Sequence, residues 1–187
     1  MTDSETGITT KYYYDLTDRM MKYVESGEGY SHSVGYEYDT LNNLTHLVET
    51  INGVKHTSTY TYDEDNRVTG IDGSTLDFSY SYDSFGRLDY SGFGANSTTE
   101  ISREYFYATT ETGTQTSQIS RLDIDTPYFM ISSAFEYDDN GNLTLVDFGP
   151  NSMSYTYDSA NQLIRENSSF ADRTWVWAYD NAGNILS

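Results

Sequence analysis

The 187-residue chain has no cysteine, two prolines and only ten basic residues. Without cysteine it cannot form a disulfide, a thiolate metal site or a cysteine nucleophile. The ten basic residues stand against 29 acidic ones, which gives a formal net charge of -19. A surface this acidic repels a phosphate backbone and an anionic membrane, so we expect no nucleic-acid partner.

Long hydrophobic runs are also absent. No stretch approaches the roughly 20 apolar residues needed to span a bilayer, and residues 1–5 lack the basic and apolar regions of a signal peptide. We therefore expect no membrane insertion. Apolar residues make up 36% of the chain, and they include 19 Tyr, 8 Phe and 2 Trp. The length suffices for a core of its own, and this composition predicts a core built largely from tyrosine.

One pattern recurs along the whole chain: an aromatic residue, a spacer, Tyr-Asp, a short polar turn and an apolar residue. The stretch from Tyr80 to Leu88 shows it most clearly, and about eight copies follow one another at intervals of 20 to 30 residues. Such a period is typical of an array of supersecondary units. The motif Tyr, Asp and Gly positions are Tyr38, Asp39, Tyr62, Asp63, Tyr82, Asp83, Gly86, Tyr137, Asp138, Gly141, Tyr157, Asp158, Tyr179, Asp180 and Gly183.

Each unit contains two short β-rich runs with a turn signal after each. Asn52-Gly53 and Asp72-Gly73 predict two-residue hairpins, because both central residues of a type I′ turn need positive φ. The sequence thus predicts an all-β fold, an array of antiparallel β-hairpins over residues 1–187, and it predicts no helix. The pattern also starts and stops inside a repeat, so we expect the chain to be a fragment of a larger protein.

The second kind of turn follows Tyr-Asp. The aspartate can accept a hydrogen bond from the backbone two residues on, and a glycine supplies the left-handed position that closes the loop. In the copies without this glycine, Asn43, Asn66 and Asn161 fall at or near its place. An odd loop length would pair the tyrosine with the closing apolar residue, and an even one would place them on opposite faces. The sequence leaves both options open.

The pattern weakens over residues 108–134, where Ala108 replaces the aspartate and a Thr-rich stretch follows. This segment is either a linker that divides the chain or a long, irregular hairpin. Residues 119–124 and 128–131 still alternate as strands do, which favours the hairpin.

The repeat resembles the unit of the YD-repeat or RHS-repeat family, aromatic-x-Tyr-Asp-x-x-Gly-Arg-Leu. Residues 80–88 match it at every defined position, and the other copies depart mainly at the Gly and the Arg. The resemblance covers the chain from about Tyr12 onward. It implies a structural module whose hairpins form a curved or spiralling sheet, part of a β-shell in large secreted or cell-surface bacterial proteins. In the toxins of this family the shell is thought to enclose a C-terminal effector.

The resemblance also sets the expected partners, which are the rest of the parent chain and an enclosed effector domain. The Asp-Pro segment that these toxins use for self-cleavage does not occur here. Exposed strand edges at both ends of such an array favour pairing with another copy, so we expect self-association.

Site chemistry gives little support for catalysis. If Asn52-Gly53 is a two-residue turn, Glu49 lies opposite His56 while His46 points to the other face, so the histidines form no metal cluster with His32. Asp138 to Asn142 resembles the start of a calcium loop, but its glycine comes too early. We expect no catalytic residue, no metal site and no cofactor, with weak calcium binding left open.

Exposed aromatic rings suggest an alternative function, a carbohydrate-binding or adhesive module. Aromatic faces stack on sugar rings, and an array offers many weak sites. Trp175 and Trp177, which a regular strand would place on one face, and Phe93 are the candidate glycan-stacking residues. The competing interpretation is that these rings, like the repeated tyrosines, pack within the fold.

Overall fold

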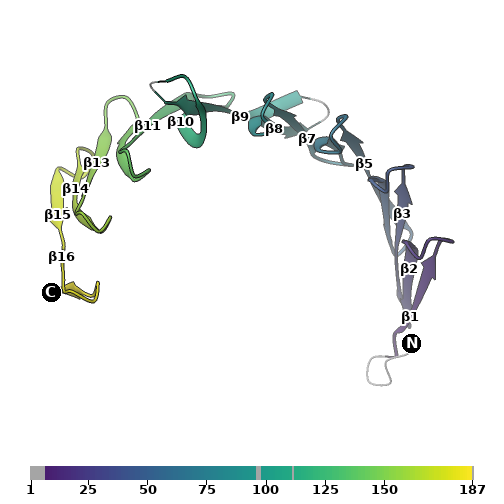
Figure 1. Ribbon diagram of the computed structural model, residues 1–187. Coiled ribbons are helices and arrows are strands. Elements are labelled where there is room, and N and C mark those ends of the chain that lie inside the picture. Colours follow the sequence, from purple (N-terminus) through teal and green to yellow (C-terminus); the bar gives the residue numbers. More distant parts are fainter. Residues whose placement is uncertain (1–6, 96–97, 111, 187) are drawn as a thin grey trace. The chain divides into compact units, whose positions relative to one another are not determined.

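The computed structural model describes residues 7–95, 98–110 and 112–186. This part of the chain consists of strands and turns without a helix, which confirms the all-β fold class (Figure 1). The strands are β1 (Thr9–Tyr14), β2 (Met20–Gly27), β3 (Tyr30–Tyr38), β4 (Leu44–Ile51), β5 (Val54–Tyr62), β6 (Val68–Asp72), β7 (Asp77–Tyr82), β8 (Leu88–Ala95), β9 (Thr98–Thr109), β10 (Gln115–Asp125), β11 (Met130–Tyr137), β12 (Leu143–Asp147), β13 (Ser152–Tyr157), β14 (Leu163–Ser168), β15 (Arg173–Val176), β16 (Ala178–Tyr179) and β17 (Ile185–Leu186).

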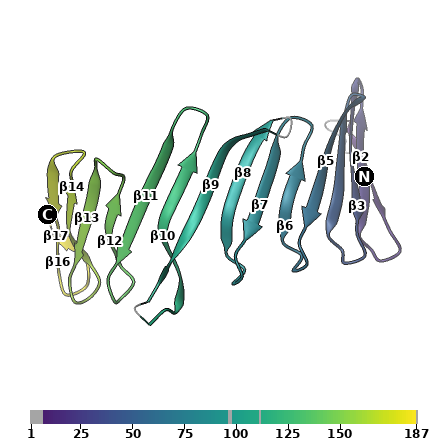
Figure 2. The ribbon, with the colours of Figure 1, turned by 90° about the horizontal axis from the view of Figure 1, so that it is seen from above.

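The strands follow one another in space in the order of the chain. β1 to β15 form one sheet in that order, and β16 and β17 form a separate two-stranded sheet. The chain divides into two compact units, Met1–Ser81 with Ser91–Glu100 and Tyr82–Tyr90 with Ile101–Ser187. Because a meander reverses at every turn, alternate turns share an edge, as those after β11 and β13 do in the second unit (Figure 2). The Tyr-Asp turns thus lie along one edge of the sheet within each compact unit.

Five residues, beginning with the aspartate, separate the tyrosine from the closing apolar residue, and these two residues pair across the hairpin. Tyr38 lies opposite Leu44, and the next pair is Glu37 and His46, which leaves Thr45 as a bulge. The same register and bulge recur where Tyr62 meets Val68. Each Tyr-Asp hairpin is therefore of the odd type.

The turns at the opposite edge are less uniform. Asn52 and Gly53 have φ of 47° and 85° between the paired Ile51 and Val54, which confirms the two-residue hairpin. The two-residue turn predicted at Asp72-Gly73 is wrong. Asp72 pairs with Asp77, and four residues connect them, closed by a hydrogen bond from Gly73 N–H to the Leu76 carbonyl oxygen. Gly73 is needed for space, because a Cβ there would lie 2.6 Å from that oxygen.

A long hairpin occupies the irregular segment. Its strands β9 and β10 pair from Ser102 opposite Asp125 up to Thr109 opposite Gln115, with two register shifts near the turn. Thr110 takes the place of the motif aspartate, since its Oγ1 accepts a hydrogen bond from Thr114 N–H at 3.0 Å. The main-chain turn bonds of the regular units are also present.

The expected tyrosine core is not a core in the usual sense. Among the described residues only Val34 and Val146 are buried hydrophobic residues, because a sheet of one layer has nothing packed on either face. Large side chains instead line up across strands, as in the row Tyr60, Ile71 and Phe78, and the Phe78 ring lies 6.2 Å from the Phe93 ring. Cross-strand contact between half-buried rings thus replaces a closed interior. In the described part of the chain, no helix has the length and apolarity to cross a membrane.

Candidate functional site

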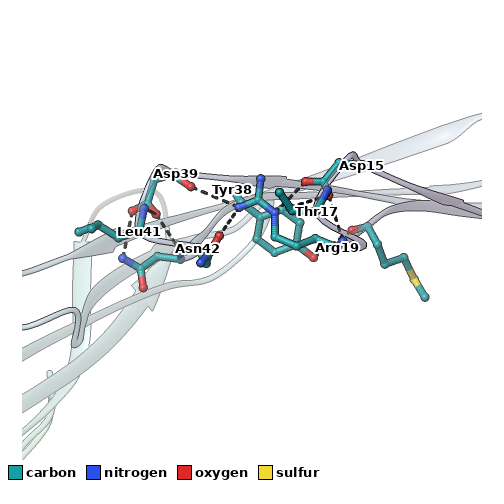
Figure 3. A network of polar contacts seen from close by, with 9 residues as sticks. Asp15, Thr17, Arg19, Tyr38, Asp39, Leu41 and Asn42 are labelled. Carbon is teal, nitrogen blue, oxygen red and sulfur yellow. Dashed lines mark hydrogen bonds and ion pairs between the residues drawn. The ribbon is translucent and has the colours of Figure 1, made fainter.

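The repeated element with a defined geometry is the Tyr-Asp turn. In the first copy, Asp15 Oδ1 accepts hydrogen bonds from the backbone N–H groups of Thr17 at 2.8 Å and Arg19 at 3.0 Å (Figure 3). Asp15 N–H donates to the Arg19 carbonyl oxygen at 2.9 Å. The same bonds occur at Asp39 and Asp63 and in the later regular copies. The aspartate thus fixes the turn from inside.

The third residue after the aspartate position lies in the left-handed region in each copy. It is Gly86 in the clearest one, with φ of 79°, and Asn66 and Asn161 in two others, as the sequence predicts. The assignment of Asn43 to this position needs correction. The left-handed residue of that turn is Asn42, with φ of 71°, and Asn43 is the fourth residue, whose side chain bonds Asp39.

Where the fourth residue after the aspartate is Arg or Asn, it binds the second carboxylate oxygen. Arg87 Nε donates to Asp83 Oδ2 at 2.6 Å, and Asn142 Nδ2 donates to Asp138 Oδ2 at 2.9 Å. Arg and Asn can both place an N–H there, which explains why these two residues interchange along the array. The motif arginine therefore orders its own turn, a role that the sequence alone did not indicate.

The motif tyrosine joins each unit to the one before it. The hydroxyl of Tyr62 donates to the carbonyl oxygen of Leu44, the closing residue of the preceding unit, at 2.8 Å. Among the described residues the bond occurs over 2.7 to 3.0 Å from Tyr38 to Met20, Tyr62 to Leu44, Tyr107 to Leu88, Tyr137 to Ile119, Tyr157 to Leu143 and Tyr179 to Leu163. We call this contact the tyrosine link.

Side chains of the fourth position reinforce the tyrosine link. Arg19 Nη1 donates to Asn42 Oδ1 of the next unit at 2.6 Å, and its guanidinium carbon lies 4.9 Å from the centre of the Tyr38 ring (Figure 3). In the second of the two compact units, the guanidinium carbon of Arg87 lies 4.0 Å from the centre of the Tyr107 ring. Asn43 makes the neutral version of this contact, with Nδ2 2.8 Å from Asn66 Oδ1. Consecutive turns are thus tied together at the sheet edge.

The electrostatics of the turn favour the charged aspartate. The backbone N–H of Arg67 and its side chain lower the pKa of Asp63 below its ordinary value of 3.8. The Asn142 side-chain amide does the same for the pKa of Asp138. Burial raises the pKa of Tyr62 and of Tyr137, so their hydroxyls remain protonated donors at neutral pH.

Removing one tyrosine hydroxyl should show how much one tyrosine link contributes to the free energy of unfolding. Tyr62→Phe leaves the Leu44 carbonyl without its donor, and we expect a loss of about 1 kcal/mol in the free energy of unfolding. Urea unfolding followed by circular dichroism gives this value. The matched control is Tyr14→Phe, because Tyr14 is 55% exposed and its hydroxyl has no acceptor among the described residues. Equal losses in both variants would show that the tyrosine link does not stabilise the array.

The three predicted glycan-stacking residues belong to different compact units, Phe93 to the first and Trp175 and Trp177 to the second. Trp175 lies on β15 opposite Glu166 and is 38% exposed. Trp177 is half-buried and follows the end of β15, and its N–H donates to the Ile164 carbonyl oxygen at 3.0 Å. Phe93 packs on Phe78 with ring centres 6.2 Å apart. Their role in glycan binding stays a prediction.

The histidines partly follow the predicted arrangement. Glu49 does lie opposite His56, but its carboxylate contacts His32, with Oε1 2.9 Å from Nε2. The register thus confirms the predicted position of Glu49, while His56 Nδ1 lies 3.3 Å from Ser74 Oγ. A diagonal contact to β3 replaces the direct one because His32 reaches Glu49 from the neighbouring strand.

The described residues include no group of three or more His, Cys, Asp and Glu side chains arranged to hold a metal ion. The carboxylate of the calcium-like stretch, Asp138, is bonded to Asn140 N–H, Asn142 N–H and the Asn142 side chain. Both oxygens of Asp138 thus accept hydrogen bonds within the turn. The aspartates of the other regular copies are engaged in the same way.

These observations define a class of protein, an array of antiparallel hairpins in which Tyr-Asp turns bond each unit to its predecessor. No family model and no curated protein sequence matches the chain. Among solved structures, the chain is similar to TcdB2-TccC3-Cdc42, with 14% identity over 96% of its length and a TM-score of 0.46. It is also similar to the Photorhabdus luminescens Tc holotoxin pore with a mutated TccC3, with 15% identity over 96% of its length and a TM-score of 0.43.

A third similar structure is a porin-like protein from Bacteroides uniformis, with 12% identity and a TM-score of 0.40 over 96% of this chain and 87% of that one. The chain spans only 14% of the length of the two toxin chains.

Proposed function

We propose that the chain is a structural module of a larger secreted or cell-surface protein, where its hairpins form part of a shell around a C-terminal effector. The tyrosine link is the observation that carries this proposal. It bonds each unit only to its neighbour, so the array extends by adding units and needs no closed core. A protein built this way suits enclosure and support of another domain.

Two further observations support a structural role over an enzymatic one. The carboxylates that recur along the chain are occupied by turn hydrogen bonds, as at Asp63 and Asp138, and are not poised for proton transfer. Few side chains are fully buried, so the sheet has accessible faces that a parent chain or an enclosed effector can cover. We accordingly propose no catalytic role. Self-association through the strand edges stays a prediction.

Limited proteolysis of the parent protein tests the enclosure. We expect the segment downstream of the array to resist a protease in the intact protein, because the shell excludes the enzyme. A double variant, Tyr137→Ala with Tyr157→Ala, removes two rings and two tyrosine links and should release the segment to digestion at least tenfold faster. Tyr14→Ala is the control, since that ring is exposed. A downstream segment digested equally fast in all three proteins would contradict the proposal.

A further inference from the structure

The long hairpin of β9 and β10 opens a groove at the edge of the Tyr-Asp turns. Between regular units, consecutive turns contact each other directly, as Asn142 Nδ2 does with Asn161 Oδ1 at 2.9 Å. The two register shifts of β10, between Gln115 and Arg121, move the turn of the long hairpin out of this pattern. Among the described residues, it bonds to the next turn through a 3.4 Å hydrogen bond from Gln118 Nε2 to the Gly141 carbonyl oxygen. A groove of about 860 Å³ lies between the two turns.

The groove has the size and the side chains of a ligand site. Its volume falls within the range of roughly 300–1,000 Å³ typical of small-molecule pockets. Thr109 stands on one wall, and Glu136, Asp139 and Asn140 stand on the other. All four side chains are exposed, and none makes a hydrogen bond with another described residue. They differ in this from Asp138, whose oxygens are engaged by the turn.

The walls are held in place before any ligand arrives. On one side, Thr110 Oγ1 lies 2.9 Å from Thr112 Oγ1 and accepts Thr114 N–H. On the other side, Asn140 N–H donates to Asp138 Oδ1 at 3.0 Å. Fixed walls reduce the ordering cost of binding, so even a shallow site gains affinity from them.

We propose that this groove binds a neutral oligosaccharide. Carboxylates such as Glu136 and Asp139 accept hydrogen bonds from hydroxyl groups, while threonine and amide side chains both donate and accept. Phe135 and Tyr137 also line the groove and share a face of β11, which offers aromatic surface to the C–H face of a sugar ring. Glu136 lies between them and faces the other side of β11, so the aromatic surface and the Glu136 carboxylate serve different rings of an oligosaccharide.

Charge selects among the other ligand classes. Glu136, Asp138 and Asp139 repel an anionic glycan, nucleotide or phosphate. A metal ion is disfavoured, because the described part of the chain brings no three His, Cys, Asp or Glu side chains together for one. This site is distinct from Trp175, Trp177 and Phe93, and it does not depend on the shell role.

The test is a glycan array probed with the 187-residue chain, followed by calorimetry. The array carries neutral hexasaccharides of glucose, mannose and N-acetylglucosamine, together with sulfated and uronic-acid oligosaccharides. We expect binding to a neutral hexasaccharide. Asp139→Ala should weaken it about tenfold or more through loss of charge-assisted hydrogen bonds. Glu136→Ala should weaken it similarly.

The matched control is Glu64→Ala, which changes the exposed residue at the same turn position as Asp139 but in a regular unit. It should bind with the wild-type affinity, and circular dichroism should show equal folding of all variants. The proposal is overturned if no neutral hexasaccharide binds, if the control loses affinity to the same extent, or if an anionic oligosaccharide binds best.

Discussion

Lowering the pH from 7 to 2 should unfold the chain, with the main loss of stability below about pH 4. Six motif aspartates have a pKa below the ordinary value of 3.8: Asp15, Asp39, Asp63, Asp83, Asp138 and Asp180. Their turn hydrogen bonds favour the carboxylate in the folded chain only. The folded state thus binds fewer protons than the unfolded state, and its stability falls as the carboxylates become protonated.

The sign of the effect follows from the direction of these pKa shifts. The contribution of each aspartate is fully present above the unfolded-state pKa of about 4 and is lost as the pH falls through the lower folded-state pKa. The charge of the whole chain acts in the opposite direction between pH 7 and its isoelectric point near 4.1, because self-repulsion disappears there. Measurement at about 0.2 M salt screens that repulsion and isolates the aspartates.

Thermal unfolding followed by circular dichroism from pH 7 to pH 2 measures this dependence. The variant Asp63→Asn should be less stable at pH 7 and should show a weaker dependence on pH, because Asn cannot titrate. Glu64→Gln, the adjacent exposed acid, should leave the curve unchanged. A melting temperature that stays constant between pH 4 and pH 2 would mean that the turn carboxylates do not stabilise the fold.

Gly86→Val should lower the free energy of unfolding of the second compact unit by about 1–3 kcal/mol, because a β-branched residue is strained at the left-handed φ of 79°. The strain acts on the turn whose Arg87 also contacts the long hairpin, since Arg87 donates to the Thr116 carbonyl oxygen and stacks on Tyr107. A disturbed turn therefore weakens the next contact along the array as well.

The matched substitution at the same site is Gly86→Asn. Asn occupies this position at Asn66 and Asn161, with φ of 61° and 59°, so we expect a loss of less than half that of the valine variant. Urea unfolding of the two variants and the wild type gives the comparison. If valine and asparagine destabilise equally, the left-handed backbone is not the cause.

The sequence predicted the parts of this fold that depend on local chemistry. Asn52-Gly53 predicted its hairpin because positive φ at two successive positions is a property of those two residues. Asp72-Gly73 carries the same signal, yet the chain closes a wider loop with Gly73 and Leu76. Register with the neighbouring strands decides between such turns, and it is not encoded in two residues.

The tyrosine link shows the limit of sequence reasoning for the candidate site. The regular spacing of Tyr38, Tyr62 and Tyr157 was visible, but a hydroxyl that bonds a main-chain carbonyl leaves no signature, since every residue has a carbonyl. The groove is equally hidden, because it arises from two register shifts between Gln115 and Arg121. The departure from the repeat at Ala108 indicates where the structure is irregular, but it does not predict the groove.

The tyrosine link also gives the array a direction. Each hydroxyl reaches back to a carbonyl that comes about 14 to 19 residues earlier, from Tyr157 to Leu143 and from Tyr107 to Leu88. During synthesis, every new hairpin that leaves the ribosome meets an acceptor that is already in place, and none has to wait for residues not yet made. The chain can fold vectorially from its first units, each finished hairpin serving as the template for the next.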